Sequence, residues 1–229
     1  MSETTAPEQG IPPVFGGHRL LYIATGSIGT MFLPMWLHWL RGAYPQMEVR
    51  CALTRSANQF VGSTAIAVTG GRPAIQDVWP DNPESATHVE LSRWADTVLV
   101  HPATFHFTAR FALGLADTPL LLALECTSAA IAVAPAPPPG ADTSPAYRRH
   151  VHQLSQRPNV VVVPPKPGFS LTTGEPGPSA ATLPDALHAL ENLRRSMTAP
   201  SSRRTRCEGP GRRSRPAGVR HRIPANPDQ

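Results

Sequence analysis

Short apolar runs alternate along this chain with segments of helical periodicity, and this alternation constrains the fold more than any other feature. Buried strands are predicted at residues 18–24, 47–54, 97–101, 130–134 and 160–163. Helices are predicted after these strands, at residues 30–44, within 55–68, and at 104–115, 147–155 and 183–197. Uninterrupted apolar strands joined by helices are typical of a parallel sheet that is covered on both faces. The sequence therefore predicts an α/β fold built on a parallel sheet.

Composition separates two terminal segments from this periodic body. Residues 1–17 are polar and rich in Pro and Gly, with no apolar stretch after a basic start, so they indicate a flexible leader rather than a signal peptide. Residues 198–229 contain almost no large apolar side chains, and we expect this Arg/Pro-rich tail to be disordered. The folded domain is predicted to occupy residues 18–197.

Charge and cysteine content exclude several classes of function. The formal net charge of +5 comes from the tail, and the body is close to neutral, so nucleic-acid binding is not expected. The charged tail is expected to keep the protein soluble, and the alternative is that it acts as an RNA-binding arm. No apolar stretch is long enough to cross a membrane. The three cysteines, Cys51, Cys126 and Cys207, are widely spaced, which predicts no disulfide framework and no metal site and fits a cytoplasmic setting.

Small polar residues follow two predicted strands, at the edge where parallel sheets hold their ligands. Thr25-Gly26-Ser27-Ile28-Gly29 joins the first strand to a helix, and small residues there allow the backbone to approach a phosphate. Ordinary tight-turn chemistry is the alternative. Thr54-Arg55-Ser56-Ala57 follows the second strand, and its hydroxyls either cap the next helix or hold a cofactor phosphate.

Three histidines are candidates for acid–base chemistry, because imidazole titrates near neutral pH. His88 opens the segment 88–94, which is either helical or extended, while His101 and His106 flank the end of a predicted strand. Taken singly, each is more simply a structural or an exposed histidine.

In combination and in order, these segments resemble the homo-oligomeric flavin-containing cysteine decarboxylases. That family includes the phosphopantothenoylcysteine decarboxylases of coenzyme A synthesis and the lantibiotic decarboxylases, of which the microbisporicin type is the most similar. The resemblance runs from about His18 to Asp185. Four segments carry it. The first two are Thr25-Gly26-Ser27-Ile28 and residues 53–61, which contain a Thr-x-Ser motif and Phe60-Val61. The other two are residues 88–96 and His101-Pro102-Ala103-Thr104, which is followed downstream by Gly114-Leu115-Ala116-Asp117.

The resemblance implies a flavodoxin-like or Rossmann-like three-layer sandwich that binds FMN, with FAD as the alternative. It implies oxidative decarboxylation of the C-terminal cysteine of a ribosomal precursor peptide to an aminoenethiol, which leads to an S-aminovinyl-cysteine ring. It also implies a homotrimer, or a dodecamer built from trimers, with the flavin at a subunit contact. His88 takes the place of the family's catalytic histidine. The resemblance also implies a set of flavin-binding residues: Gly26, Ser27, Ile28, Thr54, Ser56, Phe60, Pro102, Ala103 and Thr104.

Two stretches depart from the family pattern. His106 and Phe107 replace the Asn-Thr of its Pro-Ala-Ser-Ala-Asn-Thr motif. Its substrate clamp, Pro-x-Met-Asn-x-x-Met-Trp, is matched here only by Pro135, with Pro137 and Pro138 as further substrate-binding candidates. These losses argue against the phosphopantothenoyl substrate and favour a specialised peptide substrate. Two alternatives stay open: a phosphopantothenoylcysteine decarboxylase-like enzyme for a small molecule, and a non-catalytic flavin-binding regulatory subunit.

Overall fold

The core of the protein is a six-stranded sheet of order β3-β2-β1-β4-β5-β6 in which every strand pairing is parallel. The computed structural model describes residues 11–81, 85–169 and 174–199. The strands are β1 (Arg19–Ala24), β2 (Glu48–Leu53), β3 (Ile75–Gln76), β4 (Thr97–Ala103), β5 (Ala130–Pro135) and β6 (Val160–Val162). Apart from the short β3, the strand order is that of flavodoxin-like folds. The predicted α/β fold with a parallel sheet is confirmed.

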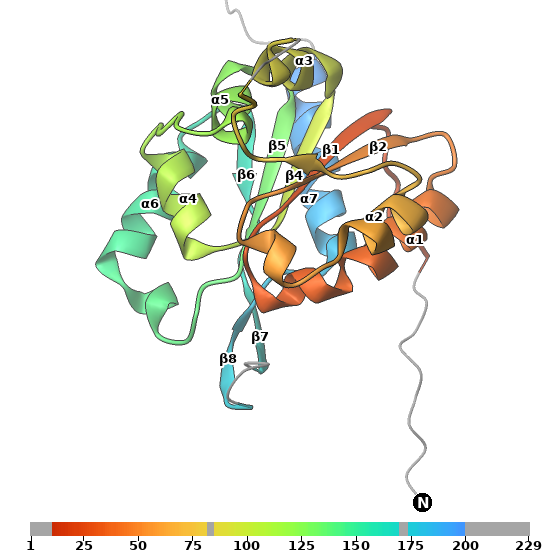
Figure 1. Ribbon diagram of the computed structural model, residues 1–229. Helices are drawn as coiled ribbons and strands as arrows, with labels where there is room; N and C mark the ends of the chain where they lie inside the picture. Colours follow the sequence, from red (N-terminus) through yellow and green to blue (C-terminus); the bar gives the residue numbers. More distant parts are fainter. Residues whose placement is uncertain (1–10, 82–84, 170–173, 200–229) are drawn as a thin grey trace, which may run out of the picture. The chain divides into compact units, whose positions relative to one another are not determined.

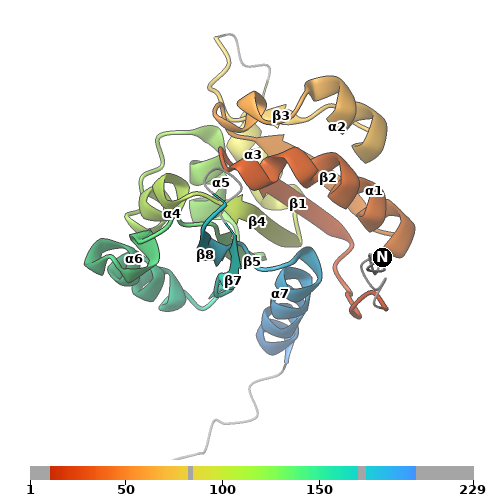
Figure 2. The same cartoon turned by 90° about the horizontal axis from the view of Figure 1, so that it is seen from below.

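Helices cover both faces of the sheet and complete three layers (Figures 1 and 2). One face packs against α1 (Leu33–Ala43), α2 (Ser63–Gly70) and α7 (Leu183–Thr198). The other face packs against α3 (Thr87–Trp94), α4 (Phe105–Ala112), α5 (Pro119–Cys126) and α6 (Pro145–Ser155). Successive side chains of β1 enter opposite layers, with Leu20 and Tyr22 on the first side and Leu21 and Ile23 on the second, because strand side chains alternate in direction. Within the described ranges, none of these helices is both long and apolar enough to cross a membrane.

Several predicted elements differ in detail from the structure. The helix predicted at 30–44 begins as a 3-10 turn, η1 (Ile28–Phe32), before α1, whose first turn holds Pro34. The segment 55–68 contains a second short turn, η2 (Ala57–Gln59), before α2 starts. The segment 88–94 is helical. A two-stranded antiparallel hairpin, β7 (Lys166–Phe169) with β8 (Pro176–Ser179), was not predicted, because proline argues against strand assignment.

Part of the predicted leader contacts the folded body. The Tyr44 hydroxyl donates to the Pro13 carbonyl at 2.7 Å, and the Gly16 N–H donates to Glu191 Oε2 at 3.0 Å. Glu191 is buried in α7 and forms ion pairs with Arg194 and Arg195, and the bond from Arg194 is the main reason why its pKa falls to about 2. Residues 1–10 and 200–229, which include nearly all of the predicted disordered tail, lie outside the described residues.

Candidate functional site

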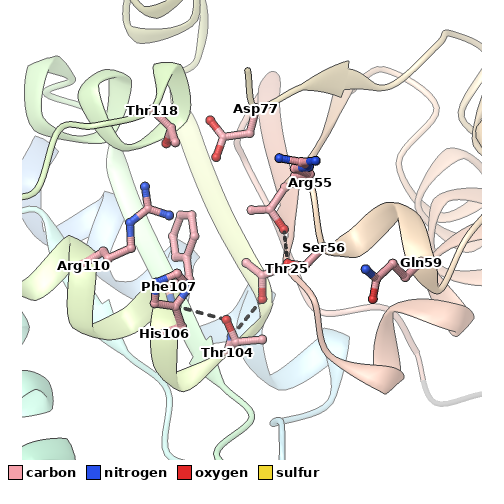
Figure 3. A pocket seen from close by; sticks show the side chains of 11 residues that line it. Thr25, Arg55, Ser56, Gln59, Asp77, Thr104, His106, Phe107, Arg110 and Thr118 are labelled. Carbon is pink, nitrogen blue, oxygen red and sulfur yellow. Dashed lines mark hydrogen bonds between the residues drawn. The ribbon is translucent and has the colours of Figure 1, made fainter. Parts of the chain in front are cut away.

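A pocket of about 460 Å³ lies at the carboxyl ends of the first four strands (Figure 3). One lining residue follows each strand directly: Thr25 after β1, Thr54 after β2, Asp77 after β3 and Thr104 after β4. The remaining lining residues are Arg55, Ser56, Gln59, His106, Phe107, Arg110 and Thr118. In the sheet, β2 and β3 follow β1 on one side, whereas β5 and β6 follow β4 on the other side. The strand order therefore reverses between β1 and β4, and ligands of open α/β sheets bind at such a switch point.

Thr25 joins the turn after β1 to the start of α4. Its side chain is buried, and its hydroxyl donates to the Pro102 carbonyl at 2.7 Å and accepts from the Thr104 N–H at 2.8 Å. The Thr104 hydroxyl in turn accepts from the Phe107 N–H at 3.2 Å and caps α4. The floor of the pocket is therefore one hydrogen-bonded unit that spans two strands.

Replacing Thr25 with Val tests this unit. We expect the free energy of unfolding to fall by about 1 kcal/mol, because the Thr104 N–H loses its partner in a partly buried place. Urea unfolding measures the change. Thr69→Val is the matched control, because that hydroxyl bonds to Ala65 of its own helix at an exposed position. Equal stability of the two variants would contradict the role given to Thr25.

The turns after β1 and β2 touch each other at Gly26. A Cβ atom added to Gly26 would lie 2.3 Å from the Ser56 Oγ and 2.5 Å from the Ser56 Cβ, which is closer than atoms can pack. The Thr54 and Ser56 hydroxyls lie 3.3 Å apart at the pocket wall. Gly26 is therefore needed for the close approach that places these hydroxyls side by side.

The predicted cofactor residues divide into two groups. Thr54, Ser56 and Thr104 line the pocket. The others lie close in sequence to these three but are not among the lining residues: Gly26, Ser27, Ile28, Phe60, Pro102 and Ala103. Pro102 and Ala103 are buried in β4, while Ile28 is exposed at the start of η1. The sequence motifs thus lie beside the pocket, but only three of the predicted side chains line it.

The pocket carries more positive than negative side chains. Arg55 and Arg110 line it together with the imidazole of His106, against the single carboxylate of Asp77 among its lining residues. Asp77 Oδ1 accepts from the Leu120 N–H at 2.9 Å, and burial raises the pKa of Asp77 while this bond opposes the rise. Arg110 pairs with Asp117 and thereby lowers the pKa of that carboxyl. Cations beside clustered hydroxyls suit a phosphate-bearing ligand.

His88 lies on α3 and is not one of the residues that line the pocket. Its ring packs edge-on against Trp79 with 5.7 Å between ring centroids, and Trp79 Nε1 donates to the Asp117 carbonyl at 3.0 Å. Within the described residues, His88 Nδ1 is buried and has no hydrogen-bond partner. A series of contacts thus runs from His88 through Trp79 and Asp117 to Arg110, which lines the pocket.

His101 has a structural role. It is buried in β4, where its Nε2–H donates to the Ala181 carbonyl at 2.8 Å and its Nδ1 accepts from the Tyr22 hydroxyl at 2.7 Å. Because a carbonyl oxygen only accepts, the proton of the neutral ring lies on Nε2. The Trp36 ring packs at 4.5 Å between centroids. Burial lowers the pKa of His101 to about 4, so the imidazole is neutral at physiological pH.

The proline candidates for substrate binding lie apart from the pocket lining. Pro135 is buried at the end of β5, opposite Ala103 of β4. Pro137 is buried and Pro138 is exposed in the loop that follows. A Cβ atom added to Gly177 of the hairpin would lie 3.4 Å from Pro139, so the hairpin β7–β8 packs against this loop.

Asp77 is the clearest site residue that the sequence did not reveal. It directly follows β3, which has only two residues and gives no strand pattern in the sequence. Arg110 and Phe107 were recognised as parts of a predicted helix. Their spacing from Thr104, the N-cap residue, could have placed them on the pocket side of that helix.

A doubly wound sheet with a polar pocket at its switch point is typical of nucleotide-binding α/β proteins. The chain belongs to the Flavoprotein family, whose model matches residues 15–190. It is 30% identical over 187 residues to the cypemycin cysteine dehydrogenase (decarboxylating) of a Streptomyces species, covering 79% of this chain and 94% of that protein.

Two solved structures are similar over most of their length. The crystal structure of the cypemycin decarboxylase CypD matches with a TM-score of 0.67 and 29% identity, covering 82% of this chain and 99% of that chain. The FMN-dependent cysteine decarboxylase SpaF matches with a TM-score of 0.65 and 27% identity, covering 77% of this chain and 97% of that chain. The predicted relationship to flavin-containing cysteine decarboxylases and the predicted flavodoxin-like fold are confirmed.

Proposed function

We propose that this protein uses FMN to decarboxylate oxidatively the C-terminal cysteine of a ribosomally made precursor peptide. The observation that carries the proposal is the match to the cypemycin enzyme over 94% of that protein's length. The pocket at the switch point supplies the place where such chemistry can occur.

The residues of the pocket fit a flavin nucleotide. The hydroxyls of Thr54 and Ser56, with Arg55 beside them, would hold the phosphate, together with the turn of Gly26, Ser27 and Ile28. Thr104 and the Phe107 ring line the pocket beside these turns and offer a wall for the flat ring system. Bound FMN would supply the acceptor for two electrons from the substrate.

The reaction needs this acceptor because a saturated carboxylate does not lose CO₂ readily. Oxidation of the cysteine Cβ–S bond to a thioaldehyde removes two hydrogens and creates an electron sink β to the carboxylate. The C–CO₂ bond then breaks, its electron pair moves toward sulfur, and protonation gives the enethiol. The protein must place the cysteine, exclude water and accept the thiol proton, for which imidazole is suited.

We assign that proton transfer to His88. His88 does not line the pocket of its own copy. We therefore propose a homotrimer, or a dodecamer of trimers, in which His88 of a neighbouring copy completes the site. The resemblance supports this assignment, because His88 takes the place of the family's catalytic histidine. We place the reaction in the cytoplasm, where precursor peptides are made.

A small-molecule substrate of the phosphopantothenoylcysteine type is the second candidate. It is disfavoured because the loop after β5 keeps Pro135 but not the Met, Asn and Trp of the family's clamp. A flavin-binding regulatory subunit without turnover is the third candidate, and its pocket would bind flavin without reacting.

We expect the purified protein to be yellow and to remove about 46 Da, the mass of CO₂ and two hydrogens, from a synthetic peptide that ends in Cys. Absorption spectra and mass spectrometry measure the two results. The same peptide ending in Ser is the control and should keep its mass. A colourless protein that takes up neither FMN nor FAD would refute the proposal. Flavin binding with turnover of phosphopantothenoylcysteine alone would favour the second candidate, and flavin binding without turnover the third.

A further inference from the structure

His88 lies in the first turn of α3, and α3 itself does little to fix the direction of its ring. Ala86 is the N-cap residue, and it makes no side-chain bond that would hold this first turn. Within the described residues, Nδ1 of His88 also makes no hydrogen bond. A histidine that transfers a proton must be held in place, because the transfer occurs only over hydrogen-bond distances. The role given to His88 therefore calls for a group outside α3 that holds the imidazole.

Trp79 makes the contact that can hold this ring. The indole of Trp79 and the imidazole of His88 lie 5.7 Å apart between centroids, with 72° between their planes. Aromatic rings attract each other in this edge-to-face arrangement. Trp79 is 48% exposed, so the hydrophobic core does not fix its position. Its position depends instead on the specific contacts that it makes.

Two hydrogen bonds hold the segment of Trp79 against residues 117–120. Trp79 Nε1 donates to the Asp117 carbonyl at 3.0 Å. Two residues earlier in the chain, Asp77 Oδ1 accepts from the Leu120 N–H at 2.9 Å. The first bond fixes the indole itself, and the second fixes the backbone that carries it.

The anchors of Trp79 belong to the wall of the pocket. Asp77 and Arg110 both line the pocket, and Figure 3 shows them on two sides of the same cavity. Arg110 pairs with the carboxylate of Asp117, whose carbonyl accepts from Trp79. The indole is therefore connected to the pocket wall through two chain segments, and the ring of His88 packs on the indole.

We propose that Trp79 is a positioning residue for His88. The inference rests on the proposed function, in which His88 accepts the thiol proton of the peptide. The indole restricts the imidazole to the orientation in which it can take up this proton. Because Trp79 acts through His88, its removal slows the step that His88 assists and leaves flavin binding and peptide affinity unchanged.

Two substitutions separate the two contacts of the indole. Trp79→Leu removes the ring, whereas Trp79→Phe keeps a ring but lacks the N–H that anchors it to Asp117. Single-turnover bleaching of the flavin with a Cys-ending peptide measures the limiting rate and the half-saturating peptide concentration. We expect the limiting rate to fall about tenfold in Trp79→Phe and about 10²-fold in Trp79→Leu, since a misplacement of about 1 Å can cost 10²-fold. The half-saturating concentration should stay the same.

The same substitution in protein that already carries His88→Asn distinguishes positioning from a general effect on the fold. The double variant Trp79→Leu/His88→Asn should be no slower than His88→Asn alone, because no imidazole is left to position. A further fall in rate, or a normal rate in Trp79→Leu alone, would overturn the proposal. Trp39→Leu is the matched control and should keep the normal rate. Its ring packs on Tyr44 at 5.9 Å in a similar geometry, and it does not line the pocket.

Urea unfolding of the same four proteins gives a readout that does not depend on turnover. Trp79→Leu should lower the urea midpoint less in the His88→Asn protein than in the unmodified protein, because the ring contact is already lost there. Equal shifts would contradict the contact. If the unmodified protein decarboxylates the peptide and His88→Asn is equally fast, the positioning role fails and the proposed function survives. If the unmodified protein alters no Cys-ending peptide, both fail.

Discussion

His88→Asn is expected to slow decarboxylation by about 10²–10⁴-fold, the usual cost of losing a general base, while the flavin stays bound. Asparagine has a similar size and keeps a hydrogen-bonding face, but it cannot take up the thiol proton. Flavin should remain bound because His88 does not line the pocket of its own copy. Single-turnover bleaching of the flavin absorbance with a Cys-ending peptide measures the rate.

His106→Asn is the companion variant in this experiment. His106 lines the pocket, so loss of the bleaching step in this variant, with normal bleaching in His88→Asn, would move the catalytic role to His106. His101 is less suited to the comparison, because its bonds to Tyr22 and Ala181 make any substitution a structural one.

Mixing two inactive variants tests the proposed oligomer and shows whether His88 acts in the pocket of its own copy or of another. His88→Asn and Gly26→Val should each be inactive alone, the second because its side chain collides with Ser56 in the flavin turn. Unfolding the two variants together and refolding them would form shared oligomers. Recovered turnover would mean that His88 of one copy serves the pocket of another. No recovery, with normal oligomers present, would place His88 in its own copy's site.

The second large effect concerns the pH dependence of stability. The pKa of His101 is about 4 in the folded protein and close to the ordinary value of 6.5 in the unfolded chain. Between these pH values the unfolded chain binds a proton that the folded protein does not. The free energy of unfolding therefore falls as the pH drops from 6.5 to 4, by about 3 kcal/mol from this group.

Urea unfolding at pH 7, 5.5 and 4, roughly the window set by the two pKa values, measures this loss. His101→Phe should be less stable at pH 7, because the Tyr22 hydroxyl and the Ala181 carbonyl lose their partner in the core. Its stability should then fall less steeply toward pH 4, since the titrating ring is gone. Parallel curves for the two proteins would show that His101 does not carry the pH dependence.

Much of the fold could be predicted because its strands are almost wholly apolar. Strands β1, β4 and β5 are buried along nearly their entire length, and such runs have a clear sequence pattern. Strand β3 and the hairpin β7–β8 could not be found this way. β3 has two residues, and the hairpin owes its pairing to backbone hydrogen bonds between segments rich in Pro and Gly.

The site was predicted at the level of turns and less well at the level of side chains. Thr54, Ser56 and Thr104 were expected in the pocket, and they line it. Asp77 and Arg110 line it as well, and their positions depend on how β3 and α4 pack. The burial of His101 also depends on tertiary packing, because its partners Tyr22 and Ala181 lie about 80 residues away along the chain.

The contact between Gly26 and Ser56 sets a rule for how sequences of this kind can diverge. A Cβ on residue 26 would lie 2.3 Å from the Ser56 Oγ and 2.5 Å from the Ser56 Cβ, so any side chain at position 26 collides with residue 56. Because every residue except glycine carries a Cβ, glycine should persist at position 26 wherever position 56 keeps a side chain, although 30 residues of chain separate them. Ancestral reconstructions should accordingly find position 26 replaced only where position 56 has become glycine.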